Sequence, residues 1–316
     1  MSVVDNGLAF IFPGQGSQSV GMLAELSETH PEVEATFRTA SETLGYDLWE
    51  LVKQGPEERL NSTEFTQPAM LAAGVAAWRV WCGNTEVRPG LMAGHSLGEY
   101  TALVCADALA FEDGLKLVQE RARLMQGAVP PEVGAMAAVL GLNDEQVVAV
   151  SRQASSDQEI VAAANFNAPG QVVVAGDRAA VERAIALAKE AGAKRAVLLP
   201  VSVPSHCPLM QTAADQFMPI LEATPMESPA IGVIHNVDVA LHPAPEVIRA
   251  ALRKQLYGSV RWADSVLFMA QQGIERFVEC GPGRVLAGLN KRIVPDARTE
   301  AIFDTTSLAK ALVLAQ

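Results

Sequence analysis

Basic residues and cysteines are scarce in this 316-residue sequence. Lys and Arg number 24 against 36 Asp and Glu, and the resulting net charge of −12 argues against general nucleic-acid binding, which requires a basic surface. The four cysteines, Cys82, Cys105, Cys207 and Cys280, include no Cys-x-x-Cys pair, so we expect neither a metal site nor a disulfide framework. Each is expected to be a small buried thiol in a reducing compartment.

Uninterrupted apolar segments of membrane-spanning length are also missing. A long apolar segment, 91–110, is interrupted by His95, Glu99 and Asp107, and the N-terminus has neither the basic start nor the apolar core of a signal peptide. The sequence therefore predicts a cytoplasmic protein without a membrane partner. Apolar residues make up 49% of the chain, enough for a full core, and 316 residues allow one large domain or two unequal ones.

A Gly-x-Ser-x-Gly motif, Gly94-His95-Ser96-Leu97-Gly98, carries the first indication of chemistry. It follows a short apolar run, 89–93, and precedes a predicted helix over 99–106, and strand-turn-helix is the context of a nucleophile elbow. The glycines leave room for a strained turn, and the helix directs its free N–H groups at the spot where an oxyanion develops. The alternative is a glycine-rich loop before a core helix.

A serine nucleophile needs a base within hydrogen-bond distance, and His206 has the best context of the five histidines. It lies in a loop that enters a predicted helix over 209–221. The less suitable histidines are His30 and His242 in polar turns, His95, which should point away from the serine, and His235 at the end of an apolar run. No Asp or Glu lies clearly at the end of a main-sheet strand, so we expect a backbone carbonyl to orient the base.

Other segments leave alternatives open. The amide- and glycine-rich turn after a buried strand, 8–12, makes Gln15 a ligand-contacting candidate or part of an ordinary turn. The turn 280–283 before a helix is a weak phosphate candidate. Helices are predicted over 31–44, with Pro31 in the first turn, and over 69–81, with Pro68 in the first turn.

The helix predicted over 111–128 carries several charged side chains, namely Lys116, Glu120, Arg121 and Arg123. Most charges on a helix form a solvated face. One guanidinium could instead point inward and bind a carboxylate through two hydrogen bonds, and the spacing does not say which.

The pattern changes after Pro130-Pro131. Strands are predicted over 135–140, 159–165, 171–175 and 194–199, with helices over 143–153, capped by Asn143, and 177–191, capped by Asp177 and closed by Gly192. This β-α-β-β-α-β order is typical of a ferredoxin-like unit. We expect a small domain, 131–200, inserted into a larger one formed by 1–130 and 201–316; the alternative is that these units continue the main sheet.

Seven segments in this order resemble the malonyl-CoA:acyl-carrier-protein transacylases of bacterial type II fatty-acid synthesis, nearly from end to end. They are Phe12–Gln18, Gly94–Tyr100, Arg121 with Leu124–Gln126, Asn165–Asn167 with Pro169–Gln171, Val203–His206, Gln255–Tyr257 and Glu279–Gly283. The resemblance implies an α/β fold, with an α/β-hydrolase-like large domain built on a parallel sheet and a ferredoxin-like insertion. It implies an enzyme that acts on malonyl-CoA and acyl carrier protein, and we expect a monomer without cofactors.

The resemblance also implies a role for each matching residue. Ser96 is the nucleophile and His206 the base, held by the backbone carbonyl of Gln255. Substrate contacts are expected from the Arg121 guanidinium to the malonyl carboxylate, from the N–H groups of Gln15 and Leu97 to the oxyanion, and from Asn165. The malonyl group is expected to pass to Ser96 and then to the phosphopantetheine thiol of the carrier.

Four basic residues in the C-terminal third, Arg253, Lys254, Lys291 and Arg292, are predicted to dock the acidic carrier or the CoA phosphates. Three alternatives stay open. The chain could be a serine esterase or thioesterase, a discrete acyltransferase for polyketide synthesis or malonate decarboxylation, or a non-catalytic subunit that binds a carrier protein.

Overall fold

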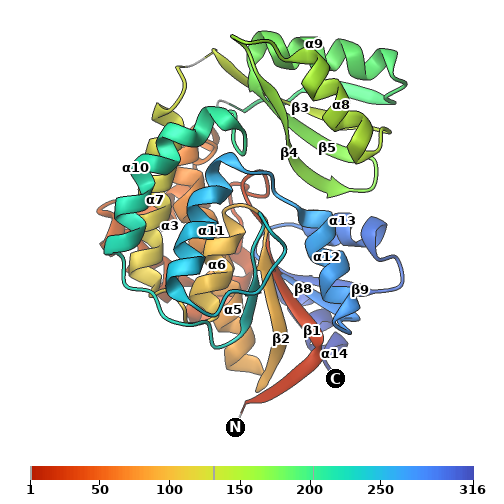
Figure 1. Cartoon of the computed structure of the whole chain (residues 1–316). Helices are drawn as coiled ribbons and strands as arrows, with labels where there is room; N and C mark the ends of the chain where they lie inside the picture. Colours follow the sequence, from red (N-terminus) through yellow and green to blue (C-terminus); the bar gives the residue numbers. More distant parts are fainter. Residues whose placement is uncertain (1, 131, 202) are drawn as a thin grey trace.

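Two separate β-sheets organise the chain in this computed structural model, which describes residues 2–130, 132–201 and 203–316 (Figure 1). Pro131, part of the predicted break, lies outside these ranges. Five parallel strands form one sheet, in the order β7-β2-β1-β8-β9. They are β1 (Val3–Phe12), β2 (Val87–Gly94), β7 (Gly232–Ile234), β8 (Arg276–Cys280) and β9 (Arg298–Ile302). The sheet confirms the expected α/β class.

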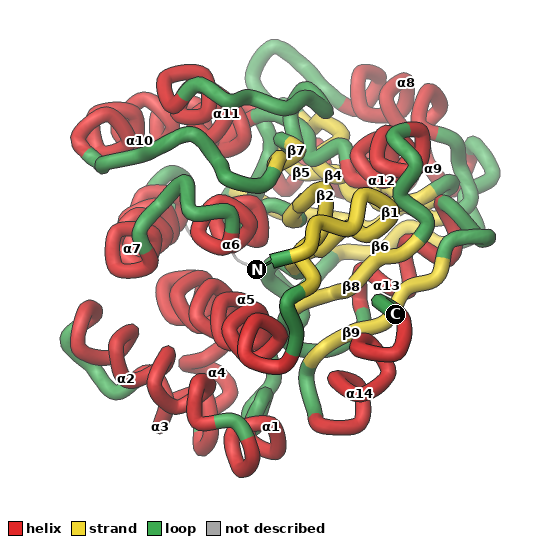
Figure 2. The backbone as a smooth tube through the Cα atoms, turned by 90° about the horizontal axis from the view of Figure 1, so that it is seen from below, coloured by secondary structure: helices red, strands yellow, loops and turns green. Residues whose placement is uncertain are grey.

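The central strand, β1, is buried on both faces of the parallel sheet. Leu8, Phe10 and Phe12 pack into the large core beneath α5 (Thr63–Asn84) and α6 (Gly98–Cys105). The alternate residues Ala9 and Ile11 face a second core that includes side chains of α12 (Trp262–Gln271) and α13 (Val285–Ile293). Figure 2 shows these two helical layers on either side of the strands. A strand covered on both faces reads as a continuous apolar run, which is why 8–12 could be predicted.

Most predicted helices are present. The remaining helices of this part are α1 (Ala24–Thr29), α2 (Pro31–Leu44), α3 (Leu48–Gln54), α4 (Glu57–Leu60), α7 (Phe111–Gly127), a 3₁₀ turn (Pro208–Met210), α10 (Gln211–Ala223), α11 (Pro245–Tyr257) and α14 (Thr305–Leu314). The placement of Pro68 was wrong, because α5 already begins at Thr63 and Pro68 lies inside it. Ser62 occupies the N-cap position of α5, and a proline in the second turn removes a single helical hydrogen bond.

The second sheet is antiparallel, in the order β4-β5-β3-β6. Its elements are β3 (Gly134–Leu140), α8 (Asp144–Ala154), β4 (Val161–Ala168), β5 (Gln171–Asp177), α9 (Arg178–Glu190) and β6 (Arg195–Leu198). Asn143 caps α8 as predicted. Asp177 occupies the cap position of α9 without capping it, because its carboxylate accepts the N–H of Ile160 instead. Helices α8 and α9 cover one face of this sheet (Figure 1).

The two sheets meet at the carboxyl ends of β1 and β2. Phe12 and Gly94, the last residues of these strands, are register partners. The residue after Gly94, His95, lies 2.8 Å by its Nε2 from Asn167 Oδ1 on β4. The ends of the central parallel strands therefore face the antiparallel sheet, whose other face is covered by helices (Figure 1). Among the described residues, no helix combines the length and the apolar character needed to cross a membrane.

Candidate active site

Ser96 lies on a tight turn between β2 and α6, in a left-handed backbone conformation with φ of 53°. Only glycine fits at the two flanking positions, because main-chain atoms lie too close for a side chain. A Cβ added at Gly94 would lie 1.9 Å from the carbonyl carbon of Gly98, and one added at Gly98 would lie 2.0 Å from Phe12 O. The turn therefore has the strained strand-to-helix geometry predicted from the motif, with the hydroxyl lifted out of the sheet.

His206 contacts Ser96 from the loop before α10. The Nε2 atom of His206 lies 2.7 Å from Ser96 Oγ, and Nδ1 lies 2.7 Å from the main-chain carbonyl oxygen of Gln255. Because a carbonyl only accepts, Nδ1 carries the ring proton and Nε2 is left to accept the serine hydroxyl. Burial, reinforced by the positive charge of Arg121, lowers the pKa of His206 to about 3. The ring is therefore neutral and able to accept a proton.

Arg121 is the inward-pointing arginine of α7, whereas Arg123 bonds to Glu120 on the exposed side. The Nη2 atom of Arg121 donates to Ser96 Oγ over 3.2 Å and to Gln255 Oε1 over 2.9 Å. Its Nη1 donates to Gln67 Oε1 over 2.8 Å. Burial lowers the pKa of the guanidinium, but an arginine stays charged at neutral pH. The site therefore places a fixed positive charge beside the serine hydroxyl.

A cavity of about 140 Å³ connects these residues. Gln15, Leu97 and Asn165 line it, together with Ser96 and His206. Within the described residues, the main-chain N–H groups of Gln15 and Leu97 have no hydrogen-bond acceptor. The Oδ1 atom of Asn165 is also buried without a donor. The cavity thus offers free donors near Ser96 and an unsatisfied amide on β4. Its further lining residues from the antiparallel sheet and the segment after it are Met136, Val173, Leu199, Val201, Val203 and Ser205.

Sequence reasoning missed the buried polar residues that hold the elbow. Asn236 accepts the main-chain N–H of Ser96 with its Oδ1 over 2.7 Å and donates its Nδ2 to Gly94 O over 2.7 Å. Glu99, wholly buried, accepts hydrogen bonds from Asn236 and Gln255. A signal for Glu99 was its place in the motif that contains Ser96. For Asn236 we find none.

The turn 280–283, the weak phosphate candidate, precedes a helix start that a side chain of the protein itself occupies. The buried carboxylate of Glu279 accepts the N–H groups of Leu286 and Ala287, at 3.1 and 2.8 Å, so the start of α13 already holds an anion of the protein. Burial raises the pKa of Glu279 to about 7, against the lowering effect of these N–H groups. A phosphate at the same helix start would be repelled by that carboxylate whenever it is ionised.

The four C-terminal basic residues lie on two helices. Arg253 is paired with Asp215. Arg292 donates to the carbonyl of Pro169, in the turn between β4 and β5, and to Gln171 at the start of β5. Lys254 and Lys291 are exposed. Helix α11 packs against α10, whereas α13 packs against α12 and β9. The four residues therefore lie on two helices with different packing partners.

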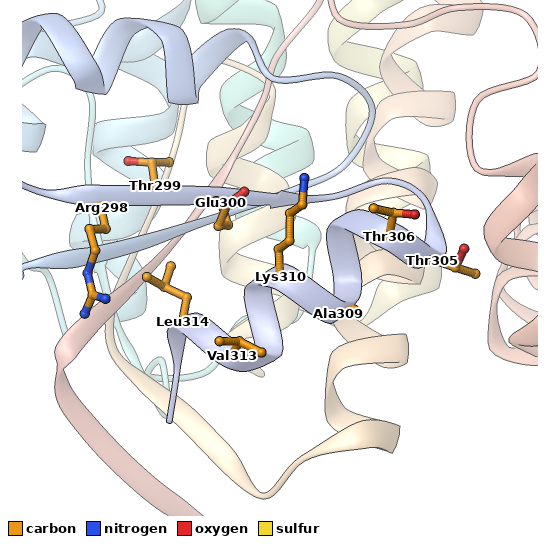
Figure 3. Close-up of a pocket in the computed structure, with 9 residues that line it drawn as sticks. All are labelled: Arg298, Thr299, Glu300, Thr305, Thr306, Ala309, Lys310, Val313 and Leu314. Carbon is orange, nitrogen blue, oxygen red and sulfur yellow. The ribbon is translucent and has the colours of Figure 1, made fainter.

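A larger cleft of about 910 Å³ lies elsewhere, between β9 and α14 (Figure 3). It is lined by Arg298, Thr299, Glu300, Thr305, Thr306, Ala309, Lys310, Val313 and Leu314. These side chains include no histidine, serine or cysteine, so the cleft lacks the serine-histidine pair that the smaller cavity contains. The smaller cavity at Ser96 is therefore the candidate active site.

Known proteins match both the sequence and the fold. The acyl transferase domain family matches residues 9–302. The malonyl CoA-acyl carrier protein transacylase of Haemophilus influenzae is 55% identical over 300 residues, covering 95% of this chain and 96% of that protein. This chain belongs to the malonyl CoA-acyl carrier protein transacylase family. It is accordingly an acyltransferase.

Solved structures of this transacylase family have the same fold. An acyl carrier protein S-malonyltransferase from Vibrio cholerae superposes with a TM-score of 0.95 at 53% identity, covering 96% of this chain and 99% of that one. A type II polyketide acyl carrier protein has been solved in complex with its malonyl-transacylase, and that structure matches with a TM-score of 0.96 at 52% identity over 98% and 99% of the two chains. The resemblance inferred from seven motifs is confirmed.

Proposed function

We propose that the chain transfers the malonyl group of malonyl-CoA to the phosphopantetheine thiol of acyl carrier protein, through an ester on Ser96. The observation that carries the proposal is the contact of Ser96 Oγ with two groups of different function. His206 Nε2 lies 2.7 Å away and can take the hydroxyl proton, and Arg121 Nη2 lies 3.2 Å away and can hold a carboxylate. A base and a cation converging on one serine suit an acyl group that ends in a free carboxylate.

In the first half-reaction, Ser96 Oγ attacks the thioester carbonyl while its proton passes to His206 Nε2. The carbonyl of Gln255 holds Nδ1–H and steadies the imidazolium. The tetrahedral intermediate collapses, the carbon–sulfur bond breaks, and His206 returns the proton to the CoA sulfur. Malonyl-Ser96 and free CoA result.

The oxyanion of each intermediate is stabilised by the free N–H groups of Gln15 and Leu97. Leu97 directly precedes α6, so the positive end of the helix dipole adds to its N–H. Asn165 contributes a polar contact to the acyl group from the antiparallel sheet.

In the second half-reaction, His206 deprotonates the phosphopantetheine thiol, which attacks the malonyl ester. The carbon–oxygen bond to Ser96 breaks and the proton returns to Oγ. Arg121 fixes the malonyl carboxylate throughout, and the narrow cavity excludes productive water, which favours transfer over hydrolysis. The lifetime of malonyl-enzyme without carrier protein tests this, since decay within one turnover time contradicts it.

The domain organisation is part of the proposal. Residues 1–130 and 201–316 form an α/β-hydrolase-like large domain, and 131–200 form a ferredoxin-like insertion. The antiparallel strand order β4-β5-β3-β6 and its two helices support the second assignment. We assign the chain to the cytoplasm, a reducing compartment that fits its four free cysteines. We further assign it as a monomer without a cofactor.

The exposed lysines Lys254 and Lys291 are proposed to attract the acidic carrier protein or the CoA phosphates. Charge reversal of either lysine should raise the KM for carrier protein or for malonyl-CoA at low salt and have less effect at high salt. Unchanged kinetics for both substrates at low salt would remove this part of the proposal.

The central experiment is mass spectrometry of the intact enzyme after mixing with malonyl-CoA. We expect a gain of one malonyl group, lost on addition of holo acyl carrier protein, and no gain in Ser96→Ala. A thioesterase would release malonate without labelling the carrier, and a non-catalytic binding subunit would not be labelled. Comparing fatty-acid and polyketide carrier proteins as acceptors distinguishes the two pathways.

A further inference from the structure

The guanidinium of Arg121 and the carboxylate of Glu99 are both buried, and one carboxamide separates them. Arg121 Nη2 donates to Gln255 Oε1 over 2.9 Å, and Gln255 Nε2 donates to Glu99 Oε2 over 2.8 Å. The cation and the anion of the site are therefore linked through the side chain of Gln255 rather than by direct contact.

The orientation of the Gln255 amide is fixed by its neighbours. Its Nε2 also donates to the main-chain oxygen of Ser96 over 2.9 Å, so one end of the amide faces two acceptors and the other end faces a guanidinium. An amide turned over would place its NH₂ against Arg121 and its oxygen against two oxygens. Only the observed orientation satisfies every group.

Glu99 is held by donors on every side that the structure describes. The Nδ1 atom of His235 lies 2.7 Å from its Oε1, and the main-chain N–H of Asn236 donates to its Oε2 over 3.0 Å. With Gln255 as the third donor, the carboxylate accepts three hydrogen bonds. These donors satisfy the buried carboxylate, and its negative charge offsets the cost of burying Arg121 nearby.

The separation has a consequence for the bound acyl group. A carboxylate in direct contact with Arg121 would make two parallel hydrogen bonds and occupy the guanidinium. Instead the guanidinium contacts the neutral amide oxygens of Gln67 and Gln255. Its positive charge is thus left for a carboxylate of the acyl group, and Glu99 weakens that attraction from a distance.

We propose that the side chain of Gln255 is a specificity-determining spacer that keeps Glu99 from pairing with Arg121, so that Arg121 selects acyl groups with a free carboxylate. The inference rests on the proposed function. It concerns the side chain and not the main-chain carbonyl that holds His206, which any residue at position 255 retains. Glu99 acts through Gln255 and is a positioning residue.

Two substitutions should shift acyl selectivity in opposite directions. Glu99→Gln keeps the size of the side chain and removes its charge, so the ratio of kcat/KM for malonyl over acetyl transfer should rise about five- to tenfold. Gln255→Ala opens the space between the two charges. Arg121 can then pair directly with Glu99, and the same ratio should fall about tenfold.

Glu279→Gln is the matched control, because Glu279 is an equally buried carboxylate whose partners are main-chain N–H groups of α13. In this variant the ratio of kcat/KM for malonyl over acetyl transfer should stay at the wild-type value. If Glu99→Gln does not fold, Gln255→Ala alone still decides the question. A purely structural role for these residues would lower malonyl and acetyl transfer alike. An unchanged or lower ratio in Glu99→Gln, or an unchanged or higher ratio in Gln255→Ala, overturns the proposal.

The wild-type enzyme separates this inference from the proposed function. If it does not transfer malonyl from malonyl-CoA to carrier protein, the proposed function fails. If it does so and prefers malonyl over acetyl, while the variants keep that preference, only the spacer role of Gln255 fails.

Discussion

His206 is oriented by the main chain of Gln255, whose carbonyl oxygen lies 2.7 Å from the ring Nδ1. A carboxylate in that place would raise the pKa of the imidazole, whereas a carbonyl adds no negative charge. Burial and the nearby Arg121 act in the other direction, and the pKa of His206 falls to about 3 from its ordinary value of 6.5. The base is therefore neutral over the whole physiological pH range.

The first prediction concerns the pH dependence of Ser96 acylation. With the pKa of His206 near 3, its proton-accepting form is fully populated well below pH 6.5. The single-turnover rate of acylation by malonyl-CoA should therefore show no inflection near pH 6.5 between pH 5 and 8. Rapid-quench measurement of malonyl-Ser96 checks this, and a sigmoidal fall centred near 6.5 would contradict it.

The second prediction concerns stability at acid pH. Because the folded-state pKa of His206 is depressed, the unfolded chain binds a proton more readily below pH 6.5. The contribution of His206 to stability is present above pH 6.5 and is lost as the pH falls toward 3, by at most about 1.4 kcal/mol per pH unit.

His206→Leu, which cannot titrate, should therefore lose less stability than the wild type between pH 7 and pH 5. Urea unfolding at a series of pH values measures the free energy of unfolding of both proteins. The contributions of the other titrating groups cancel in the difference between the two. Parallel curves for the two proteins would exclude the depressed pKa.

The fold could be predicted best where local signals set the boundaries. Helix α2 begins at Pro31 and ends before Gly45, because proline suits a first turn and glycine a helix end. The start of α5 was missed, because Pro68 in its second turn imitates the same signal.

The residues of the candidate site likewise fall into those with a local sequence pattern and those without one. Ser96 and the helix with Arg121 carry local patterns, and His206 could be ranked by its loop. The residues that join them could not be predicted from spacing, because Asn236 contacts the turn from 140 positions away in the sequence. Such contacts depend on how the strands are ordered in the sheet, which one sequence without relatives does not determine.

The third prediction tests Arg121 as the carboxylate-binding residue. Arg121→Ala should lower kcat/KM for malonyl transfer by about 10- to 100-fold, the range for loss of a charge-assisted hydrogen bond, and leave acetyl transfer largely intact. Arg123→Ala on the same helix, whose side chain is exposed and paired with Glu120, is the control and should change neither. Equal losses for malonyl and acetyl would refute the assignment.

The fourth prediction concerns Asn236, which bonds to both sides of the elbow. Asn236→Ala leaves the N–H of Ser96 and the carbonyl of Gly94 without partners, so unfolding free energy should fall by about 2–4 kcal/mol. Acylation should slow for malonyl and acetyl alike, since the elbow serves both. Asn84→Ala, which removes one bond to Val80 O near the end of α5, should cost far less and leave the rates unchanged. A selective loss of malonyl transfer would assign Asn236 to acyl recognition instead.

The fifth prediction concerns the two glycines of the elbow. Gly94→Ala and Gly98→Ala would each bring a Cβ to about 2 Å from a main-chain atom, so the turn must open. We expect at least about 3 kcal/mol of destabilisation and loss of Ser96 acylation, because neither main chain can move without displacing β1 or α6. Gly288→Ala is the control. Gly288 lies on the exposed side of α13, and a Cβ added there meets nothing within 4 Å. The free energy of unfolding of this variant should rise by about 0.5–1 kcal/mol. If Gly94→Ala keeps wild-type stability and acylation, the close packing of the turn is not what holds Ser96 in its strained conformation.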